Sequence, residues 1–325
     1  MWVQPRGVNR LINNKLHLAV VLTGLVLTVL ALALLPSAAW AQPLRLDGCG
    51  ATAPAKPLAS ILVEGRKRYM ITSVPKAYQN KTRHHLVMAF HGRTNTNAQV
   101  KRYFDLEGHG GTPAIFVYPN GLTTENHDDD DSEYSWWDIG NDPKGLRDFA
   151  FVDAMLKHYR SQYCIGDVFA VGYSLGASFA NSLACARGDQ LRGIATLGGG
   201  IERIKCTGRV AAMLIHNPED RLAPIKLGVA AKERFRRHAG YAETTQPVEP
   251  RSYNCVRYGP QSSPYPLVWC PHNKNHNRRG RYYPHNWPPG TGAVMMNFFN
   301  SLPPEGPAQT LSVTPGRKPV IKKVD

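Results

Sequence analysis

The residues best suited to chemistry lie at 172–176, which read Gly-Tyr-Ser-Leu-Gly. This segment directly follows the apolar run 168–171 and directly precedes a run of helical character, 177–187. At a sharp turn between a strand and a helix, the serine backbone is strained so that its hydroxyl projects, and flanking glycines avoid collision. An ordinary glycine-rich turn is the alternative, but this context favours Ser174 as a nucleophile for acyl transfer. The amide of Leu175, at the helix start, is the expected donor to an oxyanion.

A serine hydroxyl is a weak nucleophile, so it needs a histidine base and a carboxylate that orients the base. In the fold that uses this turn, the three follow in chain order Ser, Asp or Glu, His. Asp220 lies in the loop after the apolar run 211–215, and we expect it to be the acid, whereas the neighbouring Glu219 is typical of a solvated loop charge. His285 lies just before the last predicted helix, and we expect it to be the base.

Two other histidines follow Asp220. His272 and His276 lie in a stretch rich in Asn, Lys and Arg, which is typical of a surface loop. Their spacing suits a metal site only on a helix, and Pro271 with several nearby Asn residues disfavours a helix. We therefore predict no metal and no cofactor.

A second oxyanion donor is expected before the nucleophile. Residues 89–94 read Ala-Phe-His-Gly-Arg-Thr and follow a predicted strand. A His-Gly turn at this place can present a backbone amide to the site, and we expect that amide to be the one of Arg93. His91 is either a structural residue that bridges loops or a contact for the substrate.

These residues need a sheet to position them. Short apolar runs alternate with longer stretches of helical period, which predicts an α/β fold: a mostly parallel sheet with helices on both faces. The predicted strands are 60–64, 68–74, 85–90, 114–118, 167–171, 192–197, 210–215 and 265–270, and the predicted helices are 146–162, 175–187, 225–238 and 291–301.

The N-terminal 41 residues are expected to be a secretory signal peptide. Basic residues precede an uncharged apolar run at 18–35, and the small-residue pattern Ala-Trp-Ala at 39–41 predicts cleavage before Gln42. An uncleaved membrane anchor is the alternative, because 18 apolar residues is near the lower limit for crossing a bilayer. Signal cleavage predicts a secreted protein, extracellular or periplasmic, without stable membrane association.

The composition indicates a globular chain, with 42% hydrophobic residues. The formal net charge of +15 falls to +12 without residues 1–41, which hold three basic residues and no acidic one. The basic residues are scattered and lack an aromatic-interleaved motif, so we predict no nucleic-acid binding and a solvated surface that favours anionic polymers. Residues 122–145, which include Asp128 to Asp131, are too polar to bury much surface and are predicted to be a loop. The consecutive acids lack the alternating ligand spacing of a calcium loop, which disfavours a calcium site. We expect 303–325 to be a Pro-rich, basic, disordered tail.

All six cysteines lie after the predicted cleavage point, and an even number in an exported chain predicts disulfides. None is in a Cys-x-x-Cys pair, which disfavours a zinc site. Six cysteines allow 15 pairings, so their number alone does not define the connectivity.

Five motifs along the chain, by their residues and their order, resemble those of the secreted polyhydroxybutyrate depolymerase and feruloyl esterase family of carbohydrate esterases. The resemblance runs from about Gly48 to Leu302. The family's aspartate loop usually begins His-Gly-Thr, and its histidine motif usually reads Gly-Gly-His-x-Trp-Pro; here the loop begins His-Asn-Pro, and Tyr-Pro replaces the two glycines. The motifs are His-Gly-Arg at 91–93, Tyr-Pro-Asn-Gly-Leu at 118–122, the serine turn at 172–176, the loop 216–224, and His-Asn-Trp-Pro at 285–288.

The resemblance implies an α/β-hydrolase domain at 42–302 that hydrolyses carboxylic esters through an acyl-enzyme, with Ser174, Asp220 and His285 as the triad and no cofactor. It also implies three disulfides, Cys49–Cys164, Cys185–Cys206 and Cys255–Cys270.

The substrate depends on loops that these motifs do not define. Feruloyl esters on polysaccharide fit the aromatic residues Trp136, Trp137 and Trp287 if these line the cleft, although Trp136 and Trp137 are equally compatible with a role in capping the core. Hydroxyalkanoate oligomers fit the same triad. A different class of hypothesis is a non-catalytic protein that uses the hydrolase fold to bind wall polymer.

Overall fold

The computed structural model describes residues 47–109, 113–123, 135–139 and 143–303. The predicted signal peptide, the run Asp128 to Asp131 and residues 304–325 of the predicted tail lie outside these residues. Among the described residues, none of the helices has the length and apolar character needed to cross a membrane.

A ten-stranded sheet runs through the described chain in the order β1-β2-β4-β3-β7-β8-β9-β12-β11-β10. The six central strands, from β4 to β12, are parallel, whereas the two strands at each edge are antiparallel to their neighbours. The strands are β1 (Ser60–Val63), β2 (Arg66–Ser73), β3 (His84–Phe90), β4 (Ala114–Pro119), β7 (Ile165–Tyr173), β8 (Gly193–Leu197), β9 (Ala211–His216), β10 (Thr245–Pro247), β11 (Val256–Tyr258) and β12 (Leu267–Pro271).

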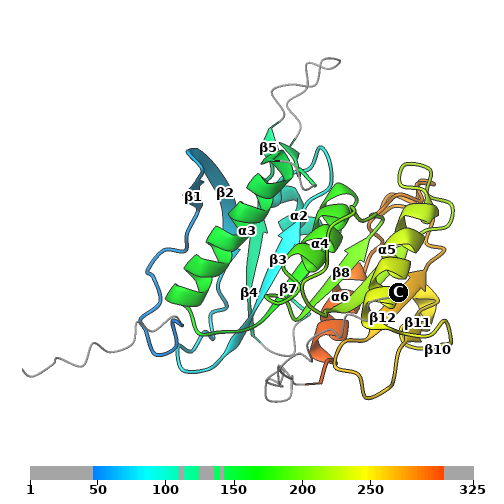
Figure 1. Cartoon of the computed structure of the whole chain (residues 1–325). Helices are drawn as coiled ribbons and strands as arrows, with labels where there is room; N and C mark the ends of the chain where they lie inside the picture. The colour runs from blue at the N-terminus through cyan, green and yellow to red at the C-terminus, as the bar shows by residue number, and fades with distance from the viewer. Residues whose placement is uncertain (1–46, 110–112, 124–134, 140–142, 304–325) are drawn as a thin grey trace, which may run out of the picture. The chain divides into compact units, whose positions relative to one another are not determined.

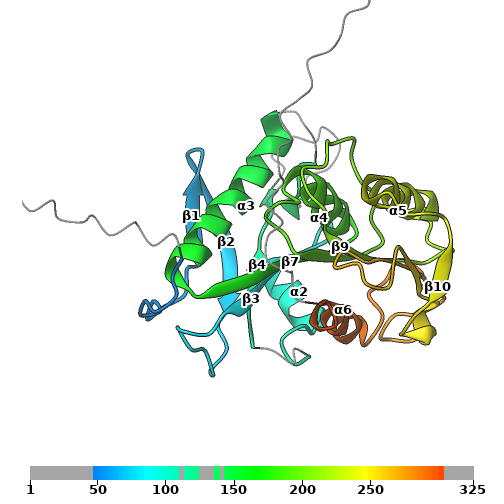
Figure 2. The ribbon, with the colours of Figure 1, turned by 60° about the horizontal axis from the view of Figure 1, so that its bottom comes forward.

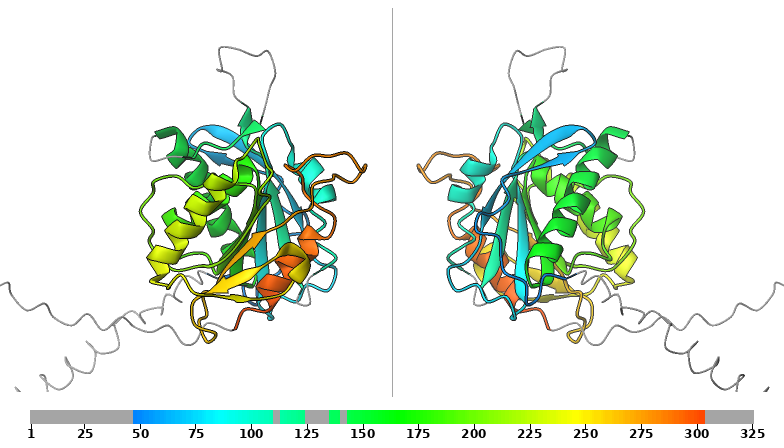
Figure 3. Two further views of the ribbon diagram at one scale, coloured as in Figure 1. Left: turned by 90° about the vertical axis from the view of Figure 1, so that its right-hand side faces the viewer. Right: turned by 90° about the vertical axis from the view of Figure 1, so that its left-hand side faces the viewer.

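Helices cover both faces of this sheet (Figure 1). Figures 2 and 3 show α3, α4 and α5 on one face and α2 and α6 on the other. A central parallel sheet between helices, with β3 and β4 exchanged in order and an antiparallel hairpin at one edge, is the α/β-hydrolase fold that the sequence predicted. The helices are α2 (Asn97–Tyr103), α3 (Pro143–Gln162), α4 (Leu175–Ala186), α5 (Ile225–Ala239) and α6 (Thr291–Asn300), with a 3₁₀ turn at Arg251–Tyr253.

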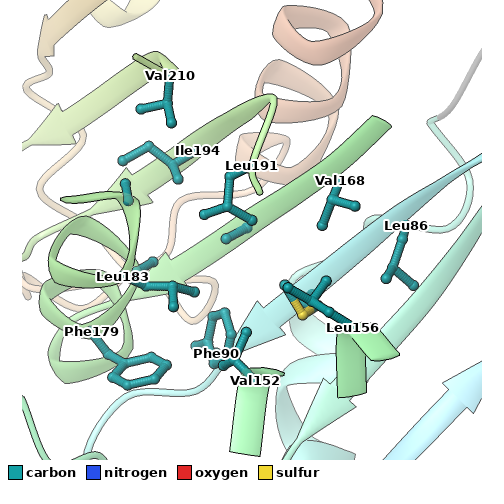
Figure 4. Close-up of a cluster of buried hydrophobic side chains, with 14 of the residues drawn as sticks. Leu86, Phe90, Val152, Leu156, Val168, Phe179, Leu183, Leu191, Ile194 and Val210 are labelled. Atoms are coloured by element: carbon teal, nitrogen blue, oxygen red, sulfur yellow. The ribbon is translucent and has the colours of Figure 1, made fainter. Parts of the chain in front are cut away.

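Each face of the sheet has its own apolar core. Under α3 and α4, side chains from both helices interlock with those of the central strands, including Phe90, Val152, Phe179, Leu183 and Ile194 (Figure 4). A second cluster packs α2 and α6 against the opposite face. Because parallel strands are buried on both faces, they read in the sequence as continuous apolar runs, which is why their positions could be predicted.

All eight predicted strands and all four predicted helices are present, with ends that differ by a few residues. The sequence did not predict α2, β10 or β11. Helix α2 has seven residues and buries only Val100, too little for a helical period; a capping box defines its start, in which Thr96 and Gln99 exchange hydrogen bonds. The loop predicted at 122–145 is interrupted by the short strands β5 (Leu122–Thr123) and β6 (Ser135–Trp136), which pair with each other, and by the start of α3.

Three disulfides join the pairs that the family resemblance implied: Cys49–Cys164, Cys185–Cys206 and Cys255–Cys270. The last joins Cys255, the residue before β11, to Cys270 in β12, next to the segment that leads to His285. It therefore ties down the chain on which the predicted base lies.

Candidate active site

Ser174 lies at the turn between β7 and α4, in a backbone conformation with φ 56° and ψ −119°. A positive φ is unusual for a residue with a Cβ and persists only where the surroundings enforce it. Here the backbone packs too closely for side chains on either flank: a Cβ at Gly172 would collide with the carbonyl of Gly176, and one at Gly176 with the carbonyls of Phe90 and His91. The two glycines of the motif are thus required by close backbone contact.

Three polar side chains from distant parts of the chain meet at this turn. The His285 Nε2 atom is 2.9 Å from the Ser174 Oγ atom, and the His285 Nδ1 atom is 2.6 Å from Asp220 Oδ2. Tyr173 donates a hydrogen bond from its hydroxyl to the His285 carbonyl at 2.8 Å. A hydroxyl, an imidazole and a carboxylate in this sequence of contacts can transfer a proton from the hydroxyl to the ring.

Asp220 is fixed by the loop that follows β9. Its Oδ1 atom accepts hydrogen bonds from the amides of Leu222 and Ala223, both at 2.9 Å, which leaves Oδ2 for His285. Burial favours the neutral acid, but the hydrogen bonds from His285 and Ala223 outweigh it, so the pKa of Asp220 is lowered. The side chain is 1% exposed and stays ionised beneath the imidazole.

The same loop is closed by His216, the last residue of β9. Its Nε2 atom bonds the Ala223 carbonyl at 2.7 Å, and burial lowers the pKa of its ring. A neutral His216 with its proton on Nε2 can donate this bond. The family resemblance includes this histidine, and here it joins the two ends of the aspartate loop.

His285 is positioned by the contacts of the two residues that follow it. Asn286 donates to the carbonyls of Lys274 at 3.0 Å and Tyr283 at 2.5 Å. Trp287 stacks on Phe104, with ring centroids 3.9 Å apart and planes 5° apart. These contacts position the histidine although Tyr283 and Pro284 replace the family's two glycines.

A cavity of about 710 Å³ opens in front of Ser174 and His285. Its lining includes the aromatic residues Tyr103, Tyr173 and Trp287, here called the aromatic floor, and the role of Trp287 as a substrate contact stays a prediction. Apart from Gly92 and Leu222, its remaining lining residues are polar or basic: Arg93, Thr94, Asn95, Asn277, Arg278, Arg279, Arg281, Tyr283 and Asn286.

The predicted oxyanion donors lie beside the serine. Leu175 is the first residue of α4, so its amide is one of those without an acceptor inside the helix. Gly92 packs against the nucleophile turn so closely that an added Cβ would be 3.2 Å from the Ser174 Cβ, and Arg93 follows it at the cavity wall. The roles of the Leu175 and Arg93 amides stay predictions.

For His91 and Trp137 the structure contradicts a contact with substrate and supports the alternative, a structural role. His91 is fully buried; its Nε2 atom accepts the Gly121 amide at 2.9 Å, and burial lowers the pKa of its ring to about 4, so it is a neutral bridge between loops. Trp137 is also fully buried, packs on Phe90 and Phe179, and donates its indole N–H to the His91 carbonyl. Both serve the core beneath the site.

Trp136 and His272 differ from expectation in other ways. Trp136 contacts Arg93, whose guanidinium carbon is 5.4 Å from the ring centroid, but is not part of the cavity lining. His272 is fully buried, not a surface-loop residue, and burial lowers its pKa to about 4. It directly follows β12 and is not in a helix, and no group of three metal-binding side chains is found within the described ranges.

The sequence did not single out the arginines at 278, 279 and 281 or Tyr103 as part of the site. The segment 277–281 reads Asn-Arg-Arg-Gly-Arg, and its polarity predicts a surface loop. The sequence contained one signal for these arginines: three of them surround a glycine only a few residues before His285.

No protein-family model matches the chain. A protein described as probable feruloyl esterase C of Aspergillus clavatus is 28% identical over 223 residues, covering 65% of this chain and 75% of the relative. Feruloyl esterase D of Neurospora crassa is 25% identical, covering 77% of this chain and 87% of the relative. Among solved structures, a Bacillus cereus carboxylesterase is 12% identical with a TM-score of 0.48, covering 72% of this chain and 93% of that structure.

The sheet order and the serine turn define the chain as an α/β-hydrolase. Its relatives confirm the resemblance to feruloyl esterases that its motifs indicated: it is a feruloyl esterase-like α/β-hydrolase. The same relatives support the broader class of carboxylic ester hydrolases for this chain.

Proposed function

We propose that this protein is a serine carboxylesterase that hydrolyses feruloyl and related aryl esters through an acyl-enzyme. The observation that carries the proposal is the chain of contacts from Ser174 through His285 to Asp220, open to a cavity with an aromatic floor. Feruloyl esterases among its relatives favour this branch of the family over the hydroxyalkanoate branch.

In the first half of the reaction, the Ser174 Oγ atom attacks the ester carbonyl carbon while His285 Nε2 takes the hydroxyl proton. The oxyanion is held by the amides of Leu175 and Arg93. Asp220 keeps the proton of Nδ1 on the side away from the serine and stabilises the imidazolium. His285 then gives its proton to the leaving alkoxide, and the alcohol departs.

In the second half, His285 takes a proton from water, whose oxygen attacks the acyl carbon. The tetrahedral intermediate collapses, the Ser174 oxygen regains a proton from the ring, and the acid is released. An acid with an aromatic ring fits the floor formed by Tyr103, Tyr173 and Trp287, because offset and edge-to-face ring contacts favour such a ligand.

The deciding experiment is hydrolysis of methyl ferulate, p-nitrophenyl butyrate and a hydroxybutyrate oligomer by the wild type and by Ser174→Ala. We expect turnover that is fastest on methyl ferulate and is lost in the variant, with kcat falling by about 10⁴-fold or more. Turnover that persists in the variant overturns the serine mechanism. If the wild type cleaves none of the three esters but binds wall polymer, the protein is a binder that keeps the hydrolase fold.

We propose export as the setting of this activity. Three disulfides among the described residues support an oxidising compartment, as the predicted signal peptide does. N-terminal sequencing of the protein from the culture medium tests this proposal, with Gln42 as the expected first residue.

A further inference from the structure

A short projection with three arginines borders the cavity, here called the arginine hairpin and defined as residues 275–283. Its two arms meet at a bridge between His276 and Tyr282, and the Tyr283 amide donates to the Asn275 carbonyl at 2.7 Å. At its tip, Asn277 accepts the amides of Arg279 and Arg281 through its side chain at 2.9 and 3.1 Å. Gly280, at φ 73°, takes the left-handed conformation that this turn requires.

The arginine hairpin is anchored to the body of the protein on two sides. At its base, Glu219 accepts hydrogen bonds from Asn275 Nδ2 and the Tyr282 hydroxyl, both at 2.5 Å. Near its tip, Arg278 donates to the carbonyl of Tyr103, the last residue of α2, at 2.9 Å. Figure 3 shows the segment after β12 projecting beside α2, in agreement with that bond. The arginines are thus held at the cavity rather than on a free loop.

The charge of this rim is not compensated. Arg278, Arg279 and Arg281 are exposed and line the cavity, and within the described ranges none of the three pairs with a carboxylate. Glu219, the acidic side chain at the base, is already engaged by Tyr282 and Asn275, and these bonds lower its pKa. Guanidinium groups at a cavity wall that holds fixed aromatic rings are suited to bind a planar anion such as a carboxylate.

We infer that the arginine hairpin selects esters whose alcohol part carries a carboxylate, as an acidic sugar of a polysaccharide does. This inference rests on the proposed esterase function and specifies its substrate class. In this proposed binding mode an aromatic acyl group occupies the aromatic floor beside Ser174, and the alcohol part extends toward the arginine hairpin, which lines the same cavity. Arg279 and Arg281, whose side chains are exposed at the cavity, meet the carboxylate there.

The test compares esters of equal shape and different charge. The first pair is 3-butyryloxybenzoate and 3-butyryloxybenzamide, which differ in the charge of the alcohol part. The second pair is 4-nitrophenyl glutarate monoester and its terminal amide, which differ in the charge of the acyl part. The quantity measured is the ratio of kcat/KM for the anionic ester to kcat/KM for the neutral ester within one pair.

For the first pair we expect this ratio to fall by about tenfold or more in the double variant Arg279→Gln/Arg281→Gln, because two charge-assisted contacts are lost. The intrinsic reactivity of each ester is the same with every variant, so a change in the ratio reports on the enzyme. Arg237→Gln is the matched control: Arg237 is exposed in the last turn of α5, outside the cavity lining, and both rates should stay at the wild-type level.

A measurement on the wild type alone avoids any effect of substitution on folding. Raising NaCl from about 0.1 to 1 M shortens the Debye length from about 10 to 3 Å, so the ratio for the first pair should fall several-fold. The inference is overturned if the ratio for the first pair changes neither with salt nor in the double variant. It is also overturned if the anionic ester is preferred only in the second pair. If the neutral esters are not cleaved at all, it is the proposed esterase function that fails.

Discussion

The turn at Ser174 and the two loops that bring Asp220 and His285 to it are held by different forces. At the turn the constraint is steric: backbone atoms of Gly176 and of residues 90–91 fill the space where side chains would be. The two loops have little regular structure and depend on directional bonds, from His216 to Ala223 and from Asn286 to Lys274. Steric constraints tolerate no change of shape, whereas a bonded loop tolerates most changes that keep its donors and acceptors in place.

The largest effect is expected where one bond defines a protonation state. In Asp220→Asn, the amide oxygen can still accept the amides of Leu222 and Ala223, so the nitrogen faces His285 Nδ1. That nitrogen is a donor, so the ring must carry its proton on Nε2 and cannot accept the one from Ser174. We expect kcat to fall by about 10⁴-fold.

Initial rates on p-nitrophenyl butyrate measure this fall in kcat, and thermal unfolding shows whether the variant is folded. The control is Asp153→Asn, which removes a surface ion pair with Arg187 and should leave the rate within about twofold. A loss of less than about tenfold in Asp220→Asn would mean that another acid orients the histidine.

The second-largest effect is expected at the turn, where the constraint is steric. In Gly176→Ala, the new methyl group meets two backbone carbonyls that cannot rotate away. We expect a loss of about 3 kcal/mol or more in the free energy of unfolding, measured by urea titration. Gly108→Ala is the matched control, since no atom lies within 4 Å of the Cβ position, and its effect should stay within about 0.5 kcal/mol. Equal losses in both variants would contradict a steric constraint at the turn.

This difference explains which features were predictable from sequence. The turn requires two glycines and a serine at fixed spacing between a strand and a helix, so its signal is local. The continuous apolar run of β9 is equally local and placed Asp220 in the loop after the right strand, and the helical period of α6 placed His285 just before the right helix.

The features that were missed depend on contacts between distant residues. Arg278 bonds Tyr103, 175 residues earlier in the chain, and nothing near either residue predicts that contact. The burial of Trp137 and His91 follows from their packing on each other and on β3 and α4, which the local pattern leaves open. The polar neighbours of His272 in the sequence predict a surface position, yet the residue lies directly after β12, in the interior.

The smallest effect tests whether the loops tolerate the loss of single bonds. Glu219→Gln keeps the shape of the side chain but offers one acceptor where two are used, by Asn275 and Tyr282. An exposed hydrogen bond contributes little to folding, so we expect kcat/KM for p-nitrophenyl butyrate to fall by about two- to fivefold and thermal unfolding to stay close to that of the wild type. Glu202→Gln, at another exposed site, is the control and should leave both quantities unchanged. A loss near that of Asp220→Asn would break the comparison, because it would make Glu219 the carboxylate on which His285 depends.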